Sequence, residues 1–169
     1  MRNERLENFL AHSVELESEA QERYLELADT MAAHHNREVA DFFRRMAVEA
    51  SNHLREVAEL AGGMTLPPLK PWEFTWPDQE PPETASYEAL HYRMTLRQAI
   101  ELALSNERAA EGFYRSVADG SPDPETARVA GQFADEELEH AAALENMLAK
   151  LPANGGFERV EDDDPVMPE

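Results

Sequence analysis

The stretch Phe133-Ala134-Asp135-Glu136-Glu137-Leu138-Glu139-His140 decides the fold. Its Glu137 and His140 stand three residues apart, so in a helix both side chains project from one face. The same face continues with apolar residues at steps of three and four, namely Ala130, Phe133, Leu144, Met147 and Leu151. This periodicity predicts a helix whose buried side carries a carboxylate and an imidazole. Because an isolated charge is costly to bury, the pattern indicates a metal ion or a hydrogen-bonded partner.

Two interpretations of this pair are open at this point. Glu-x-x-His directed inward from a bundle helix is the ligand spacing of di-metal sites. A chain rich in glutamate also places Glu and His three residues apart by chance, and then Glu137 and His140 form a solvated or hydrogen-bonded pair.

The composition limits what a site could hold. The chain has no cysteine, which excludes disulfides, thiolate zinc sites and cysteine-ligated iron–sulfur centres. Any metal is therefore held by carboxylate and imidazole, which suit hard or borderline cations. Thirty-five acidic against fifteen basic residues give a formal net charge of −20. Such a charge attracts cations and disfavours nucleic acid and anionic membranes as partners.

Length and terminal sequence predict one cytoplasmic domain. A chain of 169 residues can bury a core without disulfides or structural metals. Its start, Met1-Arg2-Asn3-Glu4-Arg5, leads into an amphipathic pattern without a long apolar run, so we expect neither a signal peptide nor a membrane span. We predict a bundle domain over residues 1–152 and a loosely ordered acidic tail over 153–169.

Helical periodicity predicts a first hairpin. One helix covers about residues 3–33, and its buried stripe is Leu6, Leu10, Glu17, Ala20, Tyr24, Leu27 and Met31. A short turn over 34–36 follows, with Asn36 as the predicted N-cap of a second helix that ends at Gly62-Gly63. The second stripe is Val39, Phe43, Met46, Ala50, His53, Val57 and Leu60.

A second hairpin is predicted with equally clear boundaries. Thr95-Leu96-Arg97-Gln98 has the spacing of a capping box and opens a third helix. Its stripe is Leu96, Ile100, Ala103, Glu107, Ala110, Tyr114 and Val117. After the break at Gly120-Ser121-Pro122, Asp123 is the predicted N-cap of a fourth helix, with Pro124 at its first position and an end near Leu151.

The segment between the hairpins, residues 62–91, predicts a long crossover. Its prolines deny it a long helix; they are Pro67, Pro68, Pro71, Pro77, Pro81 and Pro82. A helix of about 26 residues is roughly 39 Å long, and about 12 extended residues travel that distance. The fold class is therefore all-α, a four-helix bundle of two antiparallel hairpins joined by a Pro-rich crossover.

The two hairpins repeat one another. Residues 17–24 align with residues 107–114, so each half has an inward Glu seven residues before a Tyr. The second helices align in three pairs, which are His53 with His140, Ala50 with Glu137, and Glu49 with Glu136. Unrelated surface residues would not fall in the buried stripe of every helix. The repeat therefore favours a site to which all four helices contribute.

With these residues the chain resembles the ferritin-like superfamily, and most closely its rubrerythrin branch, over about residues 5–150. In that family the matching positions bind two irons. The resemblance implies that the metal ligands are Glu17, His53, Glu107, Glu137 and His140. It also implies that Tyr24 and Tyr114 are catalytic residues that donate hydrogen bonds to ligand carboxylates.

The sequence departs from the family pattern at Ala50. Ala50-Ser51-Asn52-His53 stands where the first Glu-x-x-His is expected, so one carboxylate, often a bridging one, is missing. On an ideal helix Ala50 lies about 60° to one side of His53 and Glu49 about 40° to the other. Three outcomes follow: Glu49 substitutes as a metal ligand through a helix rotation or π-bulge, the site is weakened or mononuclear, or it holds no metal.

The resemblance implies a non-haem di-iron oxidoreductase that oxidises Fe(II) with peroxide or oxygen, for peroxide detoxification or iron oxidation. Two iron ions are the expected cofactor, with manganese or zinc as alternatives. The sequence lacks the Cys-rich rubredoxin module, so we expect an external electron donor. The alternative is a degenerate module that binds metal or a partner without redox catalysis. The aromatic residues of the crossover and the resemblance predict a homodimer, with or without exchanged hairpins.

Overall fold

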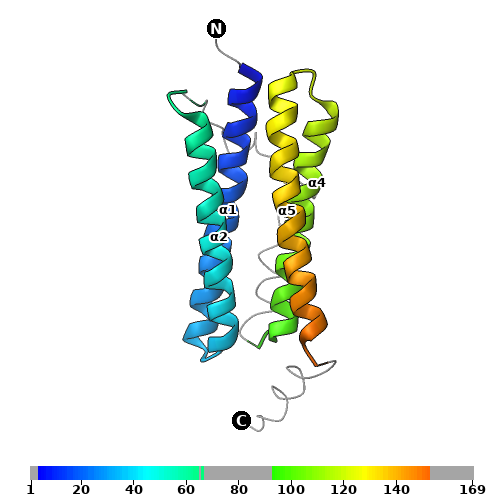
Figure 1. Ribbon diagram of the computed structural model, residues 1–169. Helices are drawn as coiled ribbons and strands as arrows, with labels where there is room; N and C mark the ends of the chain where they lie inside the picture. The colour runs from blue at the N-terminus through cyan, green and yellow to red at the C-terminus, as the bar shows by residue number, and fades with distance from the viewer. Residues whose placement is uncertain (1–3, 65, 67–92, 153–169) are drawn as a thin grey trace.

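The computed structural model describes residues 4–64, 66 and 93–152. This part of the chain contains helices α1 (Glu4–Ala33), α2 (Arg37–Ala61), α4 (Leu96–Gly120) and α5 (Pro124–Lys150), and no strand. Two antiparallel hairpins, α1–α2 and α4–α5, stand side by side (Figure 1). The predicted all-α ferritin-like bundle is confirmed. Most of the predicted crossover and the tail lie outside the described residues. The predicted domain boundaries therefore stay predictions.

The direction of each helix agrees with the predicted connection. α2 ends beside the start of α1, whereas α4 begins at the opposite end of the bundle (Figure 1). α2 and α4 therefore run in the same direction, as do α1 and α5. Two hairpins oriented in this way bring the middle of all four helices to one level. No helix of the described residues is apolar and long enough to cross a membrane.

The helix starts follow local side-chain chemistry, with one correction. Thr95 and Gln98 form the predicted capping box of α4, and Asp123 accepts a hydrogen bond from the Thr126 backbone N–H at the start of α5. Asn36 occupies the predicted N-cap position of α2, but its side chain makes no capping bond. Its Nδ2 donates instead to the Met94 carbonyl at 2.8 Å, which ties this turn to the segment that precedes α4.

The apolar core consists of two clusters with a polar level between them. One cluster is built around Tyr24, Phe43 and Ile100, and the other around Leu10 and Phe133. On each helix the predicted ligands fall in sequence between residues of the two clusters. Burial of each large apolar side chain contributes roughly 1.5–3 kcal/mol. The clusters therefore stabilise the bundle above and below a layer of charge that by itself would be costly to bury.

One predicted core position is wrong. Leu60 is 39% exposed, although it continues the stripe of α2. Its neighbours Val57 and Ala61 are buried, so at the end of α2 they cover the core in its place. The helix period identifies the correct face, but near a helix end the neighbouring elements determine how far that face is covered.

Candidate metal centre

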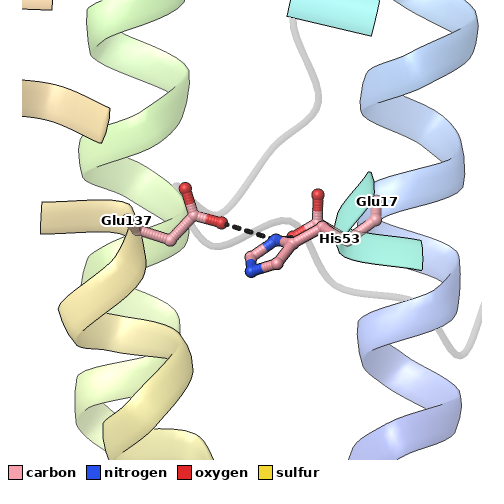
Figure 2. A group of neighbouring side chains, drawn as sticks. All are labelled: Glu17, His53 and Glu137. Atoms are coloured by element: carbon pink, nitrogen blue, oxygen red, sulfur yellow. Dashed lines mark hydrogen bonds and ion pairs between the residues drawn. The ribbon is translucent and has the colours of Figure 1, made fainter. Parts of the chain in front are cut away.

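Three buried charged side chains meet between the hairpins. Glu17 from α1, His53 from α2 and Glu137 from α5 are 4%, 5% and 2% exposed. His53 Nδ1 lies 2.8 Å from Glu17 Oε2 and 3.2 Å from Glu137 Oε2. Figure 2 shows the imidazole between the two carboxylates. One edge of His53 thus joins acids from opposite hairpins.

A second group lies next to the first and is less buried. It consists of Glu107 from α4 with Glu137 and His140 from α5. His140 Nδ1 is 3.2 Å from Glu107 Oε1 and 3.5 Å from Glu137 Oε1. Within each group the potential ligand atoms lie within 4.8 Å of one another. Five predicted ligands therefore come together, and Glu137 belongs to both groups, with Oε2 toward His53 and Oε1 toward His140.

The imidazoles of this cluster are protonated, and their positive charge offsets that of the carboxylates. Burial opposes a charge on His53, but hydrogen bonds to Glu137 and Glu17 raise its pKa to about 12. A hydrogen bond to Glu107 and the nearby negative charge of Glu137 raise the pKa of His140 to about 10. Burial, together with the neighbouring carboxylate of Glu137, raises the pKa of Glu107 to about 8. A metal ion that binds here has to displace these protons, so its binding must release them.

The residues fit a metal ion in two respects. Glu137 Oε1 is buried and accepts no hydrogen bond, which is costly for a carboxylate oxygen unless a cation compensates it. The donor atoms are carboxylate oxygens and imidazole nitrogens, a set that suits iron, manganese and zinc. One position would use Glu17, His53 and Glu137, and the adjacent one Glu107, Glu137 and His140.

The two predicted tyrosines lie on either side of this layer. Tyr114 is fully buried, and its hydroxyl donates to Glu17 Oε2 at 3.0 Å. That bond holds the carboxylate that also contacts His53. The hydroxyl of Tyr24 accepts a hydrogen bond from Asn106 Nδ2 at 3.4 Å. The Tyr114 hydroxyl thus contacts a predicted ligand, and the catalytic roles of both tyrosines stay predictions.

Ala50 and Glu49 occupy different environments. Ala50 is 7% exposed and faces the core, where its methyl group offers no ligand atom. Glu49 is exposed and lies on a cavity of about 510 Å³ between α2 and α5. Neither residue belongs to the ligand groups found in the described part of the chain. A ligand role for Glu49 therefore stays a prediction that needs a movement of the side chain or helix.

Glu136 is a contact that the sequence reasoning missed. Its Oε1 lies 2.7 Å from His53 Nε2, while Glu56 Oε1 on the neighbouring turn of α2 lies 3.7 Å away. His53, Glu56 and Glu136 form a third acidic group at the wall of the cavity. The only signal in the sequence was the alignment of Glu136 with Glu49. On an ideal helix Glu136 lies about 40° from His140 and about 100° from Glu137. It is therefore on the flank of the core stripe, and the periodicity gave no reason to expect it at His53.

Comparison with known proteins identifies the family of this chain. A model of the rubrerythrin family matches residues 8–148, and a further match covers residues 98–163. The chain belongs to the rubrerythrin family. Its bundle is similar to the 2.00 Å crystal structure of an uncharacterized conserved protein from Magnetospirillum magnetotacticum MS-1. The two chains are 40% identical, with a TM-score of 0.69, over 86% of this chain and 95% of that one. No curated protein matches. Members of the rubrerythrin family usually bind iron.

Proposed function

We propose that this member of the rubrerythrin family binds two irons and oxidises Fe(II) with hydrogen peroxide or oxygen. The observation that carries the proposal is that Glu137 belongs to both ligand groups through different oxygens. A shared carboxylate is what two adjacent cations need, because its negative charge offsets their repulsion. Glu17 with His53 would complete one position, and Glu107 with His140 the other.

The iron supplies the electrons of the proposed reaction: two Fe(II) give up one electron each, and hydrogen peroxide takes up these electrons and two protons to form two waters. With oxygen the same two electrons and two protons give hydrogen peroxide. The carboxylates favour Fe(III) because they are hard anionic ligands. Tyr114 orients Glu17, and the apolar clusters exclude bulk water from the buried side of the site. An external donor has to return two electrons, because the chain has no cysteine-ligated redox centre.

Anaerobic titration with Fe(II), followed by rapid mixing with peroxide or oxygen, tests the proposal. We expect two irons per chain and an optical change as Fe(II) is oxidised, and the faster oxidant identifies the substrate. In Glu137→Gln the side-chain volume is kept but the shared charge is lost, so binding of both irons should weaken. Glu139→Gln is the matched control, because Glu139 is exposed on the same helix. Iron binding by Glu137→Gln equal to that of the control would contradict the dinuclear site.

A metal-binding module without redox catalysis is the second candidate. It is favoured by Ala50, which leaves Glu137 as the single carboxylate shared by the two ligand groups of the described residues. This candidate predicts one bound iron, or two that react with neither oxidant. The proposed homodimer is a separate matter, and light scattering of the full chain at micromolar concentration tests it.

A further inference from the structure

His53 makes contacts with both of its ring nitrogens. Nδ1 faces the buried carboxylates of Glu17 and Glu137, and Nε2 faces Glu136 Oε1 at 2.7 Å. The Glu136 side chain is 31% exposed and lines the cavity between α2 and α5. The imidazole therefore connects the proposed metal position with a carboxylate on the solvent side.

We propose that Glu136 and Glu49 are positioning residues for the two imidazoles. Glu136 accepts the Nε2–H of His53, and Glu49 accepts the Nε2–H of His140. Each carboxylate thereby serves the histidine of the opposite hairpin. The inference rests on the proposed function, because the task that it gives to Glu136 and Glu49 is to hold each imidazole with its Nδ1 toward a metal ion.

The chemistry of the ring supports the role of Glu136. An imidazole that ligates a metal through Nδ1 carries its remaining proton on Nε2. A carboxylate at hydrogen-bond distance from Nε2 selects that tautomer, fixes the ring orientation and makes Nδ1 a stronger ligand. Glu136 meets this requirement, whereas Glu56 Oε1 at 3.7 Å lies beyond hydrogen-bond distance.

The internal repeat extends the role to Glu49. Glu136 precedes His140 by four residues on α5, and Glu49 precedes His53 by four on α2. The symmetry that places Glu136 on His53 therefore places Glu49 on His140. Glu49 and His140 line the same cavity. The Nδ1 atom of His140 already faces Glu107 and Glu137, which leaves Nε2 for Glu49.

In this role Glu49 acts from its observed position. A ligand role would instead require a distortion of helix α2. Glu49 starts on the flank of α2 away from Ala50 and is exposed in the structure. A side chain at the cavity can reach the outer edge of an imidazole from there, and it does not have to enter the core. The missing carboxylate at Ala50 and the presence of Glu49 are then two independent features.

The test uses Co(II) as the probe in the full-length protein, because its unpaired electrons shift the signals of protons on ligating imidazoles. In the wild type we expect two exchangeable, strongly shifted N–H proton signals, one for each histidine. Glu136→Ala should speed solvent exchange of one signal and Glu49→Ala that of the other. Each variant should lower Co(II) affinity about 10- to 100-fold without a change in the number of ions per chain.

Two further variants separate hydrogen bonding from charge and from folding. Glu136→Gln keeps an acceptor oxygen, so it should restore slow exchange. Glu136→Met keeps the side-chain length without an acceptor, and it should behave as Glu136→Ala does. Glu59→Ala is the matched control, because Glu59 lines the same cavity and its loss changes the net charge equally.

The contrary results distinguish failure of the inference from failure of the proposed function. Fewer Co(II) ions per chain in Glu49→Ala would make Glu49 a ligand and refute its positioning role. Variants with the exchange rates and affinity of the Glu59→Ala control would refute the inference while the proposed function stands. A wild-type protein that binds neither Co(II) nor Fe(II) would refute both.

Discussion

The two hairpins carry the same repeat but expose their histidines to different degrees. The His53 side chain in α2 is 6% exposed, whereas that of His140 in α5 is 31% exposed. The group around His53 is buried throughout, and the group around His140 is half-buried. The repeat therefore sets where potential ligands lie, while packing makes one position deep and leaves the other closer to solvent.

The hairpins also differ in the carboxylate that precedes each histidine by three residues. α5 has Glu137 at this position, and α2 has Ala50. As a result the first hairpin contributes two ligand side chains to the two groups, and the second hairpin contributes three. The buried imidazole of His53 thus depends on Glu137 of the opposite hairpin for one of its carboxylate partners. The second hairpin thus supplies one whole ligand group, Glu107, Glu137 and His140, whereas the group around His53 needs Glu137 from the opposite hairpin.

The largest expected effect comes from removal of the deeper histidine. His53→Ala leaves Glu17 and Glu137 buried without their cationic partner, so the metal-free protein should lose about 3–5 kcal/mol of unfolding free energy. His140→Ala should cost less, because its side chain is closer to solvent. Urea denaturation in the presence of a chelator measures both. Equal losses would contradict the difference in burial.

A pH titration of metal-free stability should give the next largest effect. The folded pKa values of His53 and His140, about 12 and about 10, lie above the usual value of 6.5, so the native state keeps protons that the unfolded chain loses. Their stabilisation is complete below pH 6.5 and is lost as the pH rises. Glu107, with a pKa of about 8 instead of 4.5, has the same sign.

The expected slope between pH 7 and 9 is negative, and the contribution of His53 is at most about 1.4 kcal/mol per pH unit. His53→Gln removes this contribution and should flatten the slope more than His140→Gln does at the upper end of this range. Denaturation curves at fixed ionic strength provide the measurement. A stability that rises over this range would show that the imidazolium charges are not what compensates the buried acids.

The Tyr114 hydroxyl supports the deeper group. Tyr114→Phe removes its hydrogen bond to Glu17 with little change in packing, which should cost about 2 kcal/mol because the acceptor is charged. The metal affinity of the Glu17 position should fall as well. Ser116→Ala, which removes an exposed hydroxyl from the same helix, is the control. A variant as stable as this control would mean that Glu17 needs no such donor.

The smallest effect is the gain from restored symmetry. Ala50→Glu gives α2 the carboxylate that α5 already has, so Fe(II) should bind at least tenfold more tightly, equivalent to about 1.4 kcal/mol. Metal-free stability should fall, because another acid enters the core. Val48→Glu is the matched control, since Val48 is 59% exposed on the same helix. Unchanged iron affinity in Ala50→Glu would show that the absence of a carboxylate at position 50 does not weaken iron binding.

Much of the site was readable from the sequence because helices obey a fixed period. An acid or imidazole in an otherwise apolar stripe, as at Glu17, Glu107 and His140, has to face the interior of the bundle. The capping residues Thr95 and Asp123 were equally readable, because each acts within one turn of its own helix. These inferences need only local geometry.

The remaining features depend on how one helix is placed against another. The bond from Asn36 to Met94 joins residues that are far apart in the sequence, and the Asn36 side chain makes it in place of a capping bond to its own helix. Glu136 lies off the core stripe of its own helix, yet it reaches His53 because α5 presents that flank to α2. Periodicity fixes the angle of a side chain about its own helix axis, but it does not fix the rotation and height of the neighbouring helix.

By itself the sequence determined four amphipathic helices, their boundaries and the inward direction of five potential ligands. Only the tertiary structure decided that Glu137 divides its two oxygens between His53 and His140 and that Glu49 stays at the cavity. The physical reason is that secondary structure follows from interactions along the chain, whereas distances between ligand atoms follow from the packing of apolar clusters above and below them.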